Sequence, residues 1–300
     1  MYVQCCSGNV EIHVPNKESF ISFLQSLGLS SLLIPGRVAV TVENVEDRFR
    51  NTVFEKWHER NVALRNGNGT KNNRPYIAPF FHQNIANALR LAIIYEEGGT
   101  YMDLDYVVKG DLSLQLGRNV LTLYEDGAIN NSFLRFEKNH PFLDLAMTLF
   151  VLRFKDYVWG HQGPLLMDVS FYNYCLQFVK SAAACDTVHS HGGGGGAIQL
   201  LHTNLTSPIH FKKIFEFSHL NRSSIPWQTT RAVNNSLVFH WWDKQLKDKD
   251  KKRKQRMMHK VSFDTAGGEL RDVFRRTRNE SYLSEFTSQH CPLTRPFALT

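Results

Sequence analysis

The 300-residue sequence lacks any apolar run of the roughly 20 residues that a membrane-spanning helix needs. Its first ten residues lack the basic start and the apolar stretch of a signal peptide. The five cysteines include no Cys-x-x-Cys pair, and no spacing of cysteine and histidine matches a zinc site. The residues by themselves therefore indicate neither a membrane span nor a structural zinc centre.

A strong excess of charge is also missing from most of the chain, although the formal net charge is +7. Eight Lys/Arg and two Asp fall between Lys244 and Arg256, so this one run carries most of the excess. A single lysine-rich run is typical of a solvated loop, and we expect no nucleic-acid partner. The five consecutive glycines at Gly192–Gly196 form a second low-complexity insert.

The length supports one large or two small domains with an ample core. Apolar alternation predicts strands at Val10–Val14 and Gly36–Val42, and helical spacing predicts helices over Lys17–Leu27 and Val45–His58. The Asn- and Gly-rich segment Asn61–Arg74 predicts a loop. Because strands and helices alternate, we predict an α/β fold built on a sheet.

A helix that stops at two glycines precedes the most informative motif. Its predicted apolar face consists of residues at helical spacing: Ile85, Ala88, Leu89, Ala92 and Ile93. Gly98 and Gly99 can adopt the positive φ values that end a helix at little cost. The apolar run that follows, Tyr101–Val108, predicts a short buried strand.

Asp103 and Asp105 interrupt this apolar strand. On a strand, residues at this spacing point to the same face, and unpaired buried carboxylates are costly. A bound Mg²⁺ or Mn²⁺ would relieve the repulsion, and such ions often bridge to phosphate. Two exposed aspartates that cap the next turn would give the same short pattern, so this alternative stays open from the residues alone.

A pair of amides and an apolar helix follow in the next part of the chain. Leu121–Tyr124 predicts a strand, and Asn130 and Asn131 stand at the start of another. Their amides would face sugar hydroxyls or would form a turn. Pro141 opens a nearly unbroken apolar helix to about Phe154, which we interpret as core.

The segment Trp159-Gly-His-Gln-Gly-Pro164 predicts a tight loop ahead of a helix that begins at its proline. Glycines on both sides would aim His161 and Gln162 into a cleft, although a lone histidine is often structural. Trp159 would offer its apolar face to a sugar ring or pack into the core. Further on, the apolar strand in Ser236–Asp243 delivers His240, which would be either a metal ligand or a core histidine.

Together these blocks resemble the α-1,4-glycosyltransferases, the family of lactosylceramide 4-α-galactosyltransferase-like enzymes with a DXD motif. The resemblance rests on five segments: Ala86–Arg90, Gly98–Asp105, Ala128–Phe142, Trp159–Pro164 and Ser236–Asp243. It implies a GT-A type α/β fold, Rossmann-like, with a mixed central sheet flanked by helices. Residues 1–125 would form the half that binds nucleotide-sugar and metal, and residues 126–300 the acceptor-side half.

The resemblance implies a metal-dependent, retaining hexosyltransferase. A hexose, galactose or N-acetylgalactosamine, would pass from a UDP-sugar to a hydroxyl of a glycan or glycolipid, with Mn²⁺ or Mg²⁺ as cofactor. The implied metal ligands are Asp103, Asp105 and His240. The implied donor-binding residues are Asn87, Arg90, Tyr101, Asp103, Asp105, Asn130 and Gly163. The implied residues at the reaction centre are His161 and Gln162.

The family also suggests a compartment. Relatives are usually type II proteins of the Golgi lumen, and several Asn-x-Ser/Thr sequons fit a glycoprotein of the secretory pathway. The resemblance implies a disulfide between Cys175 and Cys185. Relatives carry an N-terminal anchor and a first strand ahead of the strand at Val10–Val14, so we expect the chain to be truncated at its start.

Two other functions stay open from the sequence. In the first, the chain is an inactive or lectin-like relative that binds sugar without turnover. Asp103-Leu-Asp105-Tyr-Val107 also fits the nucleophile motif of a haloacid-dehalogenase-type phosphatase. That fold would carry the motif near the domain start and a Gly-Asp-x-x-x-Asp later, and neither condition is met.

Overall fold

The computed structural model describes part of the chain in two compact units. The described residues are 10–14, 18, 21–22, 38–42, 44–67, 75–76, 78–103, 105–109, 112–179, 198–210, 213–214 and 226–240. The first unit comprises Met1–Thr41, Asp103–Leu114 and Thr203–Thr300, and the second comprises Val42–Met102 and Gln115–His202. The units thus interleave along the chain, and the functional division at residue 125 stays a prediction.

The second unit is built on a four-stranded mixed sheet. Its strands, in spatial order, are β3 (Gly99–Met102), β6 (Ile129–Phe136), β5 (Val120–Leu123) and β7 (Gln199–Leu201). β6 pairs antiparallel with both β3 and β5, whereas β5 and β7 run parallel. β6 is thus an inner strand of the sheet, and seven of its eight residues are buried.

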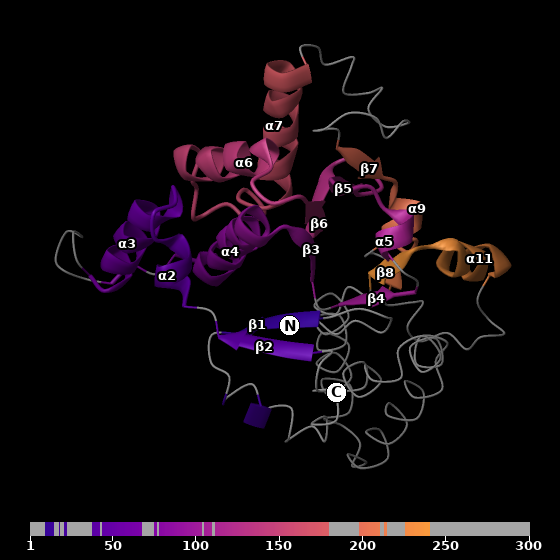
Figure 1. Cartoon of the computed structure of the whole chain (residues 1–300), viewed down its shortest axis with the longest axis horizontal. Helices are drawn as coiled ribbons and strands as arrows, with labels where there is room; N and C mark the ends of the chain where they lie inside the picture. Colours follow the sequence, from indigo (N-terminus) through magenta and orange to yellow (C-terminus); the bar gives the residue numbers. More distant parts are fainter. Residues whose placement is uncertain are drawn as a thin grey trace, which may run out of the picture. The chain divides into compact units, whose positions relative to one another are not determined.

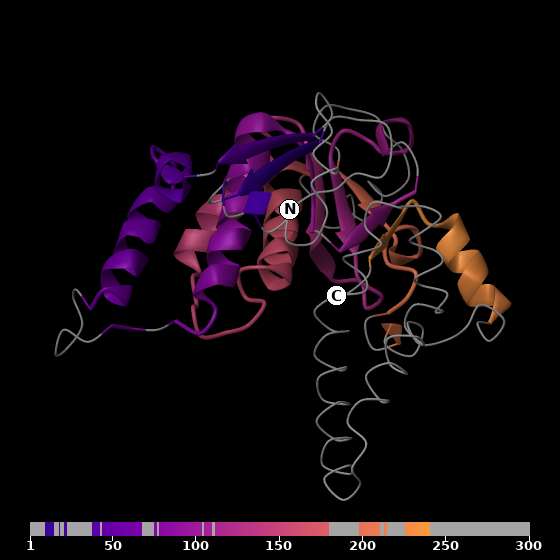
Figure 2. The ribbon, with the colours of Figure 1, turned by 90° about the horizontal axis from the view of Figure 1, so that it is seen from below.

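Helices flank this sheet. α4 (Phe81–Glu97) and α7 (Pro164–Tyr174) pack against the strands, and the π-helical turn η2 (Cys175–Val179) follows α7. α6 (Pro141–Leu152) packs on α4 and α7, whereas α2 (Val45–Phe49) packs on α4 and α3 (Phe54–Arg65) packs on α6. Figures 1 and 2 show α4, α6 and α7 on one side of the strands. Their shared core includes Leu91, Leu134, Phe142, Phe150 and Met167. The predicted α/β class, with a mixed sheet and flanking helices, is confirmed, and it is consistent with the GT-A type.

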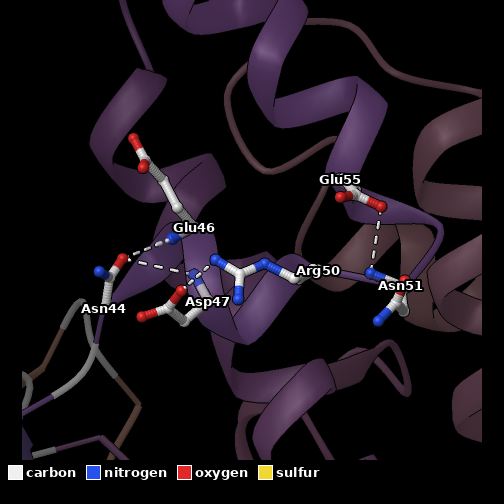
Figure 3. Close-up of polar contacts among 6 residues, drawn as sticks. All are labelled: Asn44, Glu46, Asp47, Arg50, Asn51 and Glu55. Carbon is white, nitrogen blue, oxygen red and sulfur yellow. Dashed lines mark hydrogen bonds and ion pairs between the residues drawn. The ribbon is translucent and has the colours of Figure 1, made fainter.

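The single helix predicted over Val45–His58 is wrong, because a turn separates α2 from α3 (Figure 3). Asn44 begins α2, since its Oδ1 accepts from the backbone N–H of Glu46 at 3.0 Å. Asn51 then adopts a φ of 61°, a left-handed conformation that asparagine tolerates and a continuous helix excludes. Its N–H donates to the carboxylate of Glu55 at 3.1 Å, which fixes the turn.

The break does not disturb the core, because the aromatic residues on both sides of it remain buried. Trp57 and Phe150 pack edge to face with ring centroids 5.0 Å apart. α3 also extends to Arg65, so the loop predicted from Asn61 is wrong at its start. Residues 68–74 of that predicted loop lie outside the described residues.

The first unit contains two separate strand pairs. β1 (Val10–Val14) pairs with β2 (Val38–Val42), which confirms both predicted strands. β4 (Tyr106–Val108) pairs antiparallel with β8 (Val238–His240). Short helices accompany these strands: α5 (Leu112–Gln115), α9 (Thr203–Thr206) and α11 (Trp227–Asn235). Most of the helix predicted over Lys17–Leu27 lies outside the described residues.

Within the described part of the chain, no helix combines the length and the apolar character that crossing a bilayer requires.

Candidate functional site

The predicted junction between helix and strand is present in the second unit. α4 ends at Glu97, and Gly98 and Gly99 follow with φ values of 71° and 99°. A Cβ at Gly98 would also lie 2.9 Å from the backbone nitrogen of Lys138, so only glycine fits there. The junction therefore sets the direction in which β3 leaves the helix and approaches β6.

Arg90 is a buried cation on the inner face of α4, with only 8% of its surface exposed. Its Nη1 donates to the backbone oxygen of Asn131 on β6 at 2.5 Å. Its guanidinium also lies over the ring of Tyr101 on β3, 4.4 Å from the centroid. These contacts offset the cost of burying the charge and hold β3 and β6 against α4.

Two amides meet next to this arginine. The Nδ2 of Asn131 donates to the Oδ1 of Asn87 at 3.0 Å. A Cβ built at Gly163 would lie 3.1 Å from Asn131 Nδ2 and 3.4 Å from Asn87 Nδ2, so the loop backbone lies close to both side chains. We call Asn87, Arg90, Asn131 and Gly163 the amide cluster. It brings together three of the residues predicted for donor binding and adds Asn131, whose amide was predicted to face sugar hydroxyls or to form a turn.

The residue added is Asn131, which stands next to the predicted Asn130. Successive residues of a strand face opposite sides, so only one of the two can approach α4. Asn130 is fully buried, and its Oδ1 accepts from the backbone N–H of Ser132 at 2.8 Å. Its donor-binding role stays a prediction, and the burial also closes its sequon to a glycan. Strand pairing alone determines which amide faces the helix, and the sequence did not contain that information.

The Trp-Gly-His loop is a closed turn tied to the core. The N–H of His161 donates to the oxygen of Val158 at 3.3 Å, and Gly160 has the positive φ of 74° that a type II turn needs. Gln162 is buried, and its Nε2 donates to the backbone oxygen of Phe150 at 2.7 Å. Its Oε1 is hydrogen-bonded to His161 Nδ1. These bonds give Gln162 a role in holding the loop, and the predicted roles of His161 and Gln162 at the reaction centre stay predictions.

Trp159, at the corner of the same turn, is 68% exposed. The alternative that it packs into the core is therefore wrong.

Asp168 on α7 makes a polar contact that was not predicted from the sequence. Its Oδ1 accepts from the backbone N–H of Ile129 at 2.7 Å and so ties the start of β6 to α7. Burial raises the pKa of Asp168 above its ordinary value of 3.8, and the hydrogen bond from Ile129 opposes this shift. The available signal was that Asp168 is the one charged residue between Pro164 and Tyr174.

We expect Asp168→Asn to make the stability of the protein less dependent on pH. Because the folded-state pKa is raised, the contribution of Asp168 to stability is fully present below its unfolded pKa and is lost as pH rises through the folded pKa. The asparagine can still accept from Ile129 but never ionises. Urea unfolding at pH 4 and pH 7.5 should show the variant gaining relative to wild type only at the higher pH.

Asp168→Ala is the matched comparison, since it leaves the N–H of Ile129 without this acceptor. We expect it to lose about 1–3 kcal/mol at both pH values. A relative loss of stability for Asp168→Asn as pH rises would contradict the assignment.

The predicted Asp-x-Asp strand is wrong as a continuous element. β3 ends at Met102 and β4 begins at Tyr106, so both aspartates lie in the break between two strands that join different sheets. β3 is only partly buried, whereas all three residues of β4 are buried. The argument that the two carboxylates share a strand face therefore does not hold.

Asp105 instead meets His240 within the first unit (Figure 1 shows β4 beside β8). Asp105 Oδ1 and His240 Nε2 are 3.2 Å apart, although the two residues are 135 positions apart in sequence. His240 is 4% exposed and stacks on Tyr106, its partner across the strand pair, with ring centroids 4.2 Å apart. The predicted strand that delivers His240 is confirmed.

Lys109 holds the end of β4 in place. Its Nζ donates to the backbone oxygens of Val233 and Asn234 at the C-terminal end of α11, where helix carbonyls favour a cation. Burial lowers the pKa of Lys109 to about 8. The strand that follows Asp105 is therefore anchored by side-chain contacts as well as by the ladder to β8.

The donor atoms at Asp105 and His240 suit a divalent ion, because Mn²⁺ accepts imidazole beside carboxylate. In the part of the chain that the structure describes, no three His, Cys, Asp or Glu side chains form a preformed metal-binding group. Two of the three predicted ligands are thus adjacent, and Asp103 is not assembled with them.

Two models of known protein families match this chain, and they cover different parts of it. Residues 35–125 match the model of the glycosyltransferase sugar-binding region containing the DXD motif. Residues 135–264 match the model of the alpha 1,4-glycosyltransferase conserved region. The chain is thus similar to the α-1,4-glycosyltransferases in both of these regions. Asp103-Leu-Asp105 is the one Asp-x-Asp in the first region. Gly163 and His240 lie in the second region, and Asn131 lies between the two.

The matches to individual relatives extend over only part of each relative. The mouse lactosylceramide 4-alpha-galactosyltransferase is 28% identical over 225 residues, which are 74% of this chain and 54% of the relative. The human alpha-1,4-N-acetylglucosaminyltransferase is 27% identical over 159 residues, 53% of this chain and 42% of the relative. The chain thus spans about half the length of the curated relatives it matches.

Among solved structures, the PaToxG glycosyltransferase is similar with a TM-score of 0.38 and 19% identity over 55% of this chain and 56% of that one. This likeness is too low to bear on the fold or the function.

Proposed function

We propose that this protein is an α-1,4-glycosyltransferase that acts as a metal-dependent, retaining hexosyltransferase. The observation that carries the proposal is the 3.2 Å contact between Asp105 of the DXD motif and His240. These residues come from the two regions that match the family models, and a carboxylate beside an imidazole is a ligand pair suited to Mn²⁺.

Asp103, Asp105 and His240 hold Mn²⁺ or Mg²⁺ in this proposal. The ion would neutralise the negative charge on the diphosphate of the departing UDP. His240 is kept in place by its stacking on Tyr106, and the turn that bears Asp105 continues into the anchored strand β4. These residues therefore orient the ligands at little further conformational cost.

The amide cluster, with Tyr101, binds the sugar of the donor. Asparagine side chains both donate and accept, which suits the alternating demands of sugar hydroxyls. Arg90 orients Asn131 through its backbone oxygen, and Gly163 brings a loop backbone against both amides. The cluster contains no carboxylate to act as a nucleophile, so we infer a front-face reaction in which the leaving phosphate helps deprotonate the acceptor hydroxyl.

The relatives suggest the substrates and the compartment. One is named a galactosyltransferase acting on lactosylceramide and another an N-acetylglucosaminyltransferase, so we infer a UDP-hexose or UDP-N-acetylhexosamine donor, galactose or N-acetylgalactosamine first. The acceptor is a glycan or glycolipid, and the setting is the Golgi lumen. Cys175 is disulfide-bonded, which fits an oxidising compartment. Cys185, the partner we propose, lies outside the described residues.

A test combines binding with turnover. UDP-galactose, UDP-N-acetylgalactosamine and UDP-N-acetylglucosamine are added to the protein with Mn²⁺ or with EDTA, and thermal stability and UDP release are recorded. We expect at least one donor to raise Tm and release UDP only with Mn²⁺, since a ligand that binds the native state stabilises it. Stabilisation without UDP release would indicate a sugar-binding relative, and no response to any donor would exclude the proposal.

A further inference from the structure

Trp159 exposes a large aromatic surface with no visible structural purpose. It is 68% exposed, and Tyr157, two residues before it, is 65% exposed. Trp227, which is 64% exposed, is the other strongly exposed tryptophan among the described residues, and the guanidinium of Arg231 lies over its ring at 5.9 Å. Within the described residues, no cation or second ring packs on Trp159. Exposed aromatic surface of this kind is typical of binding sites.

The exposure of Trp159 does not come from a loose loop. The turn that carries it is closed by the bond from His161 N–H to the oxygen of Val158, and Gly160 supplies the positive φ at the next position. Gln162 fastens the loop to the oxygen of Phe150 at the end of α6, and the N–H of Leu165 returns to the oxygen of Gly160 at 3.3 Å. The indole is therefore presented to solvent from a fixed backbone, which lowers the entropy cost of binding a ligand.

The same loop ends in the amide cluster. Gly163 lies against Asn131 and Asn87, and it is only four positions after Trp159. Four residues of extended chain span at most about 14 Å, and a turn shortens this distance. The exposed ring is therefore within the reach of a short oligosaccharide from the amides that we assign to the donor sugar.

We propose that Trp159, with Tyr157 beside it, forms a subsite for a hexose ring of the acceptor. The negative face of the indole attracts the C–H groups on the apolar face of a pyranose, and the hydroxyl of Tyr157 can bond to the ring substituents. This inference rests on the proposed glycosyl transfer, because the amide cluster defines which end of the loop faces the donor. The end of the loop that carries Trp159 then faces the acceptor sugar, which receives the hexose.

The test compares Trp159→Ala with Trp159→Phe, using a soluble β-galactoside as acceptor. Trp227→Ala is the matched control, since it removes an equally exposed tryptophan from the other unit. For Trp159→Ala we expect the KM for the acceptor to rise about tenfold while the KM for the UDP-sugar stays within about twofold. Trp159→Phe should recover much of the loss, because it keeps an aromatic face, and Trp227→Ala should change neither constant.

Three outcomes would overturn the inference. One is an unchanged acceptor KM in Trp159→Ala, and another is an equal loss for Trp227→Ala. The third is a loss seen only with a glycolipid acceptor in phosphatidylcholine vesicles, which would assign Trp159 to the lipid surface instead. If wild type turns over no UDP-sugar at all, the proposed function fails. Titration of the β-galactoside by NMR, with wild type and Trp159→Ala, then still decides whether this ring binds sugar.

Discussion

Replacing Asp105 with alanine is expected to lower turnover of the UDP-sugar at least about 100-fold, with the fold retained. The change removes a metal ligand and also the carboxylate that lies 3.2 Å from His240 Nε2. The side chain is only 22% exposed, yet it lies in a turn between strands, so its loss should not disrupt the core. UDP release is measured across a Mn²⁺ titration, with circular dichroism as the check on folding.

The comparison variants separate charge from geometry. Asp105→Asn keeps a side chain that can bond to His240 but loses the negative charge, so we expect nearly the same loss of turnover. Asp103→Ala tests the second carboxylate of the motif. Asp144→Ala removes an exposed carboxylate on α6 and should have little effect. Undiminished turnover in Asp105→Ala at low Mn²⁺ would end the assignment of the metal site.

Gly163→Ala is expected to lower kcat/KM about 10- to 100-fold, because small displacements of binding groups cost rate steeply. The new Cβ would lie 3.1 Å from Asn131 Nδ2 and 3.4 Å from Asn87 Nδ2, and because these amides are bonded to each other, a shift of one displaces the other. Gly117→Ala is the matched control. Its Cβ would also lie 3.1 Å from a polar atom, but that atom is the Oε1 of Gln199, which bonds to the N–H of Gly117 and lies away from the amide cluster.

A double-mutant cycle shows whether the effect of Gly163→Ala depends on the side-chain amide of Asn131. Asn131→Ala removes the side chain that the Cβ would strike, so Gly163→Ala should cost much less in that background than in wild type. Initial rates over a range of donor concentrations give the coupling for all four proteins. Additive effects would mean that Gly163 does not position Asn131. A fully active Gly163→Ala would remove the amide cluster from the donor site.

Several features of this protein were predictable from the sequence because they depend on neighbouring residues. The periodicity of α4 and the glycines at Gly98 and Gly99 specify a helix, its end and the turn into a strand. Pro141 and Pro164 mark the starts of α6 and α7 because proline fits the first turn of a helix. The apolar run before His240 was enough to predict β8.

Other features were decided by the tertiary structure, because they depend on residues that are distant in sequence. The apolar run Tyr101–Val108 is divided because β3 finds its partner in β6, whereas β4 finds its partner in β8. Local alternation cannot reveal such a change of partner. The same pairing turns Asn131 toward Asn87. Sequence alone thus determined which residue types were available for chemistry, and long-range strand pairing determined which of them meet.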